Sequence, residues 1–111
     1  MTFGFPAYHE RYILFDRNLD FHDIERILEE TFYELNLSLC GKYKNKLKAK
    51  NGFNTWSLGE QIEVSIINKN KLHIRSQCVL VTQCFDWGQN ERNVNRLTQK
   101  IMSKVLLYSS T

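Results

Sequence analysis

The sequence predicts an α+β fold, a two-layer sandwich in which two helices cover one face of an antiparallel sheet. Two stretches, 21–36 and 89–108, place apolar residues three or four positions apart, which is the spacing of amphipathic helices. Much of the remaining chain alternates apolar and polar residues, as half-buried strands do. The resulting order is β-α-β-β-β-α with short connections, which favours helices on one side of the sheet. With 111 residues and one proline, the chain is expected to form a single domain over residues 1–111.

The first expected strand covers residues 8–16, whose aromatic and β-branched side chains suit a pleated surface. In a strand, Ile13 and Phe15 lie on one side, and Tyr12 and Leu14 lie on the other. Because both sides carry apolar residues, we expect a central strand, or a strand whose second face is covered.

The expected helix at 21–36 follows Asp20, a residue type that favours the N-cap position. Residues 20–36 contain six acids and one arginine, a balance of −5. Residues 91–104 contain four basic residues and one acid, a balance of +3. Oppositely charged helices that lie side by side have complementary surfaces, so this asymmetry requires no external partner.

Residues 42–50 alternate strictly between lysine and other residues. In a single strand, this pattern places five lysines on one face: Lys42, Lys44, Lys46, Lys48 and Lys50. Further strands are expected at 58–67 and 71–80, joined by a hairpin at Asn68–Lys71. The last helix is expected to begin near Gln89.

The lysine face is the strongest candidate for a binding surface. A basic sheet face flanked by Tyr12, His73 and Arg75 can follow a phosphate backbone. The simpler interpretation is a solvent-facing strand whose lysines discourage edge-to-edge pairing, with Glu10 and Glu63 across from them. A net charge of +3 and a pI near 8.8 are low for a nucleic-acid-binding domain, for which a pI above ~9 is usual. Nucleic-acid or polyanion binding is therefore the alternative, not the favoured function.

The corner before the last helix combines an acid, an indole, a glycine and an amide: Asp86, Trp87, Gly88 and Asn90. Asp86 or Asn90 suits the helix N-cap, and Gly88 permits a turn that a side chain would block. An enzymatic site would need Asp86 to act as acid or base together with Glu60 or His73. No sequence spacing fixes a second carboxylate or a histidine near Asp86. We therefore interpret the corner as mainly structural and assign no catalytic residue.

Three segments resemble small bacterial domains of unknown function: Trp56-Ser57-x-Gly59-Glu60-x-Ile62, Ile74-x-Ser76-x-Cys78 and Phe85-Asp86-Trp87-Gly88-x-Asn90-x-x-Asn93. The likeness covers about residues 40–100 and implies no characterised activity. The element order also looks like one half of the TATA-box-binding-protein fold, which implies a fold and not a function. The chain lacks the internal duplication of the DNA-binding members of that fold. Their DNA-kinking mode is therefore not transferred to it.

Several features bear on the location of the protein and on its cofactors. The longest apolar runs are only a few residues, so we expect no membrane-spanning helix, and the N-terminal residues do not form a signal-peptide pattern. Three cysteines without a C-x-x-C spacing favour a reducing, cytoplasmic setting. No spacing of histidines and cysteines predicts a metal site, and no glycine-rich loop predicts a cofactor.

Tyr12 and Leu14 are expected on the sheet face away from the helices. Exposed apolar side chains that gather on one face commonly mark an interaction surface, and a symmetric dimer is the commonest way to cover one. We therefore expect a non-catalytic interaction or binding module that contacts a second copy or another protein through this face. The expected binding residues are Tyr12, Lys42, Lys44, Lys46, Lys48, His73 and Arg75.

Overall fold

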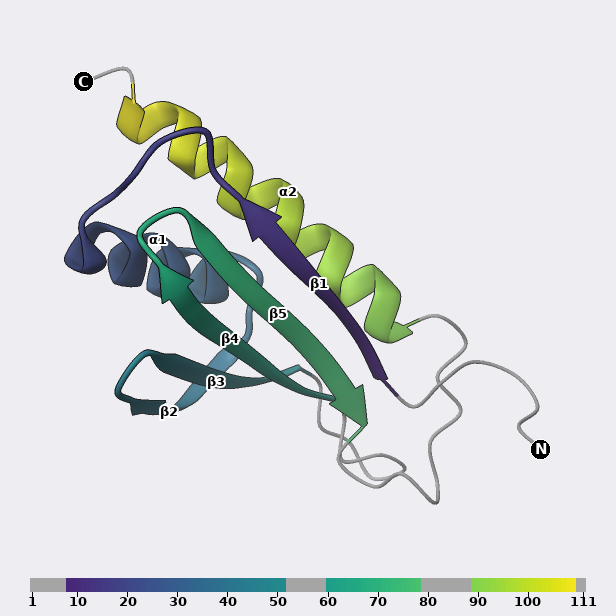
Figure 1. Cartoon of the computed structure of the whole chain (residues 1–111). Helices are drawn as coiled ribbons and strands as arrows, with labels where there is room; N and C mark the ends of the chain where they lie inside the picture. Colours follow the sequence, from purple (N-terminus) through teal and green to yellow (C-terminus); the bar gives the residue numbers. More distant parts are fainter. Residues whose placement is uncertain (1–7, 52–59, 79–88, 110–111) are drawn as a thin grey trace.

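The computed structural model describes residues 8–51, 60–78 and 89–109. These residues form a five-stranded antiparallel sheet and two helices in the order β-α-β-β-β-β-α. The elements are β1 (Tyr8–Leu14), α1 (Phe21–Glu34), β2 (Ser38–Tyr43), β3 (Lys46–Asn51), β4 (Glu60–Asn68), β5 (Lys71–Cys78) and α2 (Gln89–Ser109). The predicted α+β sandwich is confirmed, with one strand more than expected (Figure 1).

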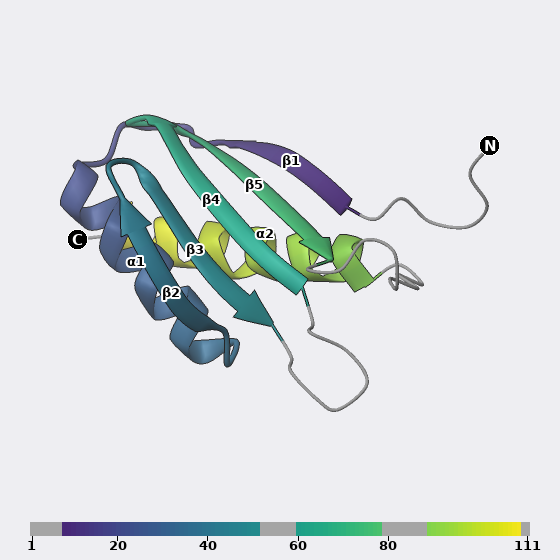
Figure 2. The same cartoon turned by 90° about the horizontal axis from the view of Figure 1, so that it is seen from below.

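The strands lie in the order β1-β5-β4-β3-β2, and each strand is antiparallel to its neighbours. β1 therefore forms one edge of the sheet and β2 forms the other (Figure 2). The expectation that the first strand is central was wrong. Its second face carries Tyr12 and Leu14, which are 60% and 65% exposed.

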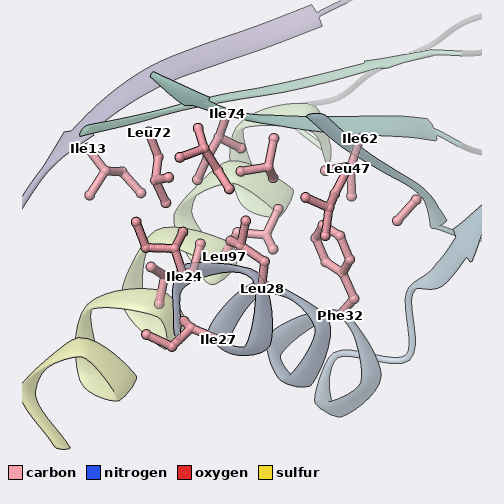
Figure 3. Packing of buried hydrophobic residues seen from close by; sticks show 14 of the residues in the cluster. Ile13, Ile24, Ile27, Leu28, Phe32, Leu47, Ile62, Leu72, Ile74 and Leu97 are labelled. Carbon is pink, nitrogen blue, oxygen red and sulfur yellow. The ribbon is translucent and has the colours of Figure 1, made fainter. Parts of the chain in front are cut away.

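Both helices pack against the same face of the sheet. α2 contacts β1 and β5, whereas α1 contacts β2 and α2 (Figure 1). Between the two layers lies one core of buried apolar side chains from every helix and from β1, β3, β4 and β5. In Figure 3 the ring of Phe32 points from α1 toward Leu47 and Ile62 of the sheet. The sequence periods therefore identified the buried faces of both helices.

α1 ends at Glu34, two residues before the expected end, because the backbone reverses at Asn36. Asn36 has φ of 59°, in the left-handed region that asparagine tolerates better than most residues. The amide of Leu37 donates to the carbonyl of Phe32 over 2.8 Å, which satisfies an otherwise free carbonyl of the last turn. Asp20 occupies the N-cap position as predicted, although its side chain makes no capping hydrogen bond.

The lysine-rich stretch does not form one strand. It forms the hairpin of β2 and β3, in which Tyr43 pairs with Lys46 and the two residues between them make the turn. Lys44 takes a φ of 53°, and Asn45 is fixed by two 2.7 Å hydrogen bonds with the backbone of Ile66. Tyr43 and Lys46 are paired across the two-residue turn, so their side chains point to the same face of the sheet. Lys42, one residue before Tyr43, therefore points to the opposite face from Lys46, Lys48 and Lys50. The prediction of five lysines on one face was wrong.

The two helices are joined by ion pairs that explain their opposite charges. Lys104 and Lys100 of α2 reach Glu34 of α1, with N–O distances of 2.7 Å and 3.0 Å, and Lys104 also lies 3.4 Å from Glu30. The hydrogen bonds from Lys104 and then Lys100 hold the pKa of Glu34 below its ordinary value of 4.5. The predicted internal use of the charge asymmetry is thus confirmed.

Replacing Glu34 with glutamine is expected to destabilise the protein at about pH 7 and to have a smaller effect at about pH 3. A carboxylate whose pKa is lowered on folding adds stability above its unfolded pKa, and this stability is lost as the pH falls through the lowered value. Urea unfolding at both pH values, for the wild type and for Glu34→Gln, measures this difference. In a Lys104→Met background the effect of Glu34→Gln at about pH 7 should shrink; an unchanged effect would assign the stabilisation to other contacts.

Candidate binding face of the sheet

The face of the sheet away from α1 and α2 is covered by no described element, and we call it the open sheet face. Its side chains follow from the strand register, because residues directly opposite one another on paired strands point to the same side. Three rows of side chains cross β3, β4, β5 and β1 in that order. The charged row is Lys48, Glu63, Arg75 and Glu10. The tyrosine–histidine row is Lys46, Ser65, His73 and Tyr12, and the amide row is Lys50, Gln61, Gln77 and Tyr8.

The charged row alternates in sign from one strand to the next. Lys48 Nζ lies 3.8 Å from a Glu63 carboxylate oxygen, and Arg75 Nη1 lies 3.9 Å from Glu10 Oε2. These distances are long for ion pairs between partly exposed groups, so each pair adds little to stability. The row therefore leaves charges of both signs accessible to a partner.

Both tyrosines of β1 lie against cations. The guanidinium carbon of Arg75 is 4.2 Å from the centre of the Tyr8 ring, and Lys71 Nζ is 4.8 Å from the centre of the Tyr12 ring. The Tyr12 ring also lies 4.7 Å from the His73 ring, centre to centre. These contacts restrict the rings while both remain exposed.

His73 lies between the aromatic residues and the charged row. Its Nε2 forms a 2.7 Å hydrogen bond with Glu10 Oε1, and Glu10 also faces Arg75. The Arg75 Nε in turn donates to Gln77 Oε1 over 3.1 Å. The β1 side of the open sheet face is therefore a connected polar network, with the two tyrosines at its edge.

Five of the predicted binding residues lie on the open sheet face: Tyr12, Lys46, Lys48, His73 and Arg75. Lys42 does not, because it pairs with Leu47, whose side chain belongs to the core. Lys42 Nζ instead reaches Glu29 at 3.1 Å and Glu25 at 3.9 Å on α1, and the hydrogen bond that Lys42 donates to Glu29 is the main reason that the pKa of Lys42 is raised. The corrected set excludes Lys42.

Lys44 lies in the turn between β2 and β3, with its ammonium 5.4 Å from the centre of the Tyr43 ring. Tyr43 pairs with Lys46 and is exposed on the open sheet face. The face on which Tyr43 lies can be predicted only if the hairpin is recognised. Asn45, a residue type that favours turns, was the one signal for the hairpin in this stretch. Lys46 and Lys48 both lie 3.8 Å from Glu63, which divides the lysines of β3 from Arg75.

A hollow of about 330 Å³ lies over the middle of the open sheet face. It is lined by five polar side chains, those of Lys48, Gln61, Glu63, Arg75 and Gln77. Pockets for small organic ligands are mostly lined by apolar and aromatic groups, which are missing from this lining. The hollow therefore does not resemble a pocket for a small apolar ligand.

A second cluster of polar side chains lies on the helix side of the sheet, under the start of α2. Ser76 Oγ donates to Asn90 Oδ1 over 2.7 Å, and Asn93 Nδ2 lies 3.1 Å from Ser76 Oγ and 2.9 Å from Glu60 Oε1. Ser76, Asn90 and Asn93 are buried, and within the described ranges no buried side-chain nitrogen or oxygen lacks a partner. This buried polar cluster fastens α2 to β4 and β5.

Asn90 lies inside α2, so its alternative role as the N-cap was wrong. Asp86, Trp87 and Gly88 lie outside the described residues, and their predicted structural role stays a prediction. The sequence did carry a signal for the buried polar cluster, since Asn90 and Asn93 share the helical spacing of the buried Val94 and Leu97.

Glu60 and His73, the two residues considered as catalytic partners of Asp86, lie on opposite sides of the sheet. Glu60 bonds to α2 on the helix side, whereas His73 lies on the open sheet face, so these two side chains do not belong to one site. In the part of the chain that the structure describes, no three histidine, cysteine or acidic side chains are grouped to hold a metal ion. Over the same residues, no helix has the length and apolar character needed to cross a membrane.

Comparisons with known proteins do not assign the chain to a family: no family model matches the sequence, and no curated protein matches it. The bacterial resemblance noted above therefore stays an expectation. The geometry of the open sheet face is the basis on which a function can be inferred for this chain.

Proposed function

We propose that this protein is a non-catalytic protein-interaction module whose contact surface is the open sheet face. The observation that supports this most directly is the alternating sign of Lys48, Glu63, Arg75 and Glu10 across four strands. A phosphate backbone is negative throughout and would meet Glu63 and Glu10 unfavourably. A protein surface that carries both signs can match such a row, which sets the register and excludes wrong partners.

The tyrosines of the open sheet face support the same function. Tyr8 and Tyr12 stand at one edge and Tyr43 at the other, and all three are exposed. Tyrosine is enriched at protein interfaces because it buries a large ring with few rotatable bonds. Since Arg75 and Lys71 already restrict two of these rings, binding loses less side-chain entropy there.

Site-specific photo-crosslinking in cells tests this function. A photoreactive phenylalanine derivative at position 12, in place of Tyr12, is expected to form a covalent adduct with a protein. The same derivative in place of Tyr33 is the matched control, because Tyr33 is similarly exposed, at 73%, but lies on α1 in the other layer. The control should give little or no adduct.

Two outcomes would overturn the proposed function. One is the absence of any protein adduct from position 12, or an equal yield from position 33. The other is an adduct from position 12 that is removed by nuclease and not by protease, which would identify the contact as nucleic acid. Circular dichroism of both variants confirms that the fold is retained.

A further inference from the structure

The rows of the open sheet face are complementary to reversed copies of themselves. Read from β3 to β1, the charged row has the signs plus, minus, plus, minus; read backwards, it has minus, plus, minus, plus. A two-fold axis parallel to the strands and lying between β4 and β5 places each row against its own reverse. Glu63 then faces Arg75 of the second copy, and Lys48 faces Glu10 of the second copy.

The two flanking rows match under the same operation. In the tyrosine–histidine row, Tyr12 faces Lys46 of the second copy, and Ser65 faces its His73. In the amide row, Tyr8 faces Lys50 of the second copy, and Gln61 faces its Gln77. Cation–tyrosine and amide–amide contacts are both favourable, and none of the twelve positions in these rows meets a like charge.

Other face-to-face arrangements match the charged row less well. Moving the axis by half a strand spacing, onto β4, brings Glu63 against Glu63 of the second copy and Lys48 against its Arg75. An axis perpendicular to the strands and through the charged row brings every charge of the row against itself. Like charges placed opposite one another across an interface oppose binding. An axis between β3 and β4, or between β5 and β1, also pairs opposite charges, but it opposes only two strands of the row; the axis between β4 and β5 pairs all four charges.

On the basis of the proposed contact face, we propose that its partner is a second copy of this chain, packed face to face about the two-fold axis between β4 and β5. Such an interface is isologous, as in most dimers, and aligned sheets pack with their strands within about 30° of one another. Twelve outward side chains cover roughly 400 Å² of flat sheet, from the spacing of strands and residues. This is about half of the roughly 800 Å² per partner of a standard interface, so we expect a weak, concentration-dependent dimer.

Reciprocal charge reversal tests the register. In a Lys48→Glu homodimer, each introduced carboxylate faces Glu10 of the other copy; in a Glu10→Lys homodimer, each introduced ammonium faces Lys48. Each variant alone is expected to dimerise roughly tenfold or more weakly than the wild type. An equimolar mixture of the two restores both opposite-charge contacts, and its heterodimer should approach the wild-type affinity.

Sedimentation equilibrium over a range of concentrations at about 0.15 M salt measures these affinities, because this ionic strength screens the net charge of +3. Lys50→Glu is the matched control, since it changes the net charge equally but faces Tyr8 and no acid under this register. It should weaken dimerisation much less than Lys48→Glu does. Mass spectrometry of the adduct from position 12 should locate the crosslink on β3 of the second copy.

The outcomes separate this inference from the proposed function. A wild-type protein that stays monomeric while position 12 crosslinks to another protein would overturn the second copy as partner and leave the proposed function standing. A dimer whose mixed variants associate no better than each variant alone would overturn the register. Loss of both dimer and crosslink would overturn both proposals.

Discussion

Replacing Phe32 with alanine is expected to lower the free energy of unfolding by about 3–5 kcal/mol. Phe32 is 1% exposed and is the largest fully buried side chain among the residues that the structure describes. Its ring fills the space between α1 and the sheet, next to Leu47 and Ile62 (Figure 3). Alanine would remove this apolar surface from the core and leave a cavity that helix and sheet can close only in part.

Tyr33→Ala is the natural control for this prediction, because Tyr33 is the next residue of the same helix and is exposed. Its effect should stay within about 0.5 kcal/mol. Urea unfolding followed by circular dichroism gives both values on one scale. Equal losses for the two variants would contradict the packing of α1 described here.

Replacing Asn90 with alanine is expected to destabilise the protein by about 1–3 kcal/mol. The Ser76 hydroxyl donates to Asn90 over 2.7 Å in a site closed to solvent, and it would lose this acceptor. A buried polar group without its partner costs more than the hydrogen bond itself contributes, because water cannot replace the partner.

The cycle of Asn90→Ala, Ser76→Ala and the double variant isolates this interaction. Removing both partners should cost less than the sum of the single losses, since the hydroxyl that has lost its acceptor is then absent. Gln99→Ala, on the exposed side of the same helix, serves as the control and should have little effect. Additive losses would show that Ser76 and Asn90 stabilise the fold independently.

The helices and most strands could be predicted because burial repeats with the local geometry of the backbone. Val94, Leu97 and Ile101 are spaced for one face of a helix, and all three are fully buried. Ile62 and Val64 alternate with polar neighbours, and both are buried in β4. Such periods depend on neighbouring residues alone, so they are readable without the tertiary fold.

The lysine-rich stretch shows where this approach fails. Alternation of lysines over 42–50 fits one strand, and it fits equally two strands joined by a two-residue turn. The two structures put Lys42 on opposite faces, and the alternation itself does not separate them; within the stretch only Asn45, a turn-forming residue, favours the hairpin. The contacts of Asn45 with Ile66 and of Lys42 with Glu29 select the hairpin, and both come from distant parts of the chain.

The sequence by itself determined the fold class, both helices and the apolar spacing of each helix, because hydrophobic periodicity is a local property. Tertiary structure decided which strands are neighbours. It thereby decided which side chains form the rows of the open sheet face. Glu10 and His73 are 63 residues apart, yet they bond because β1 pairs with β5. Strand order is set by long-range backbone hydrogen bonds, which the composition of either strand does not specify. The alternating charges on which both proposals rest are a product of that pairing.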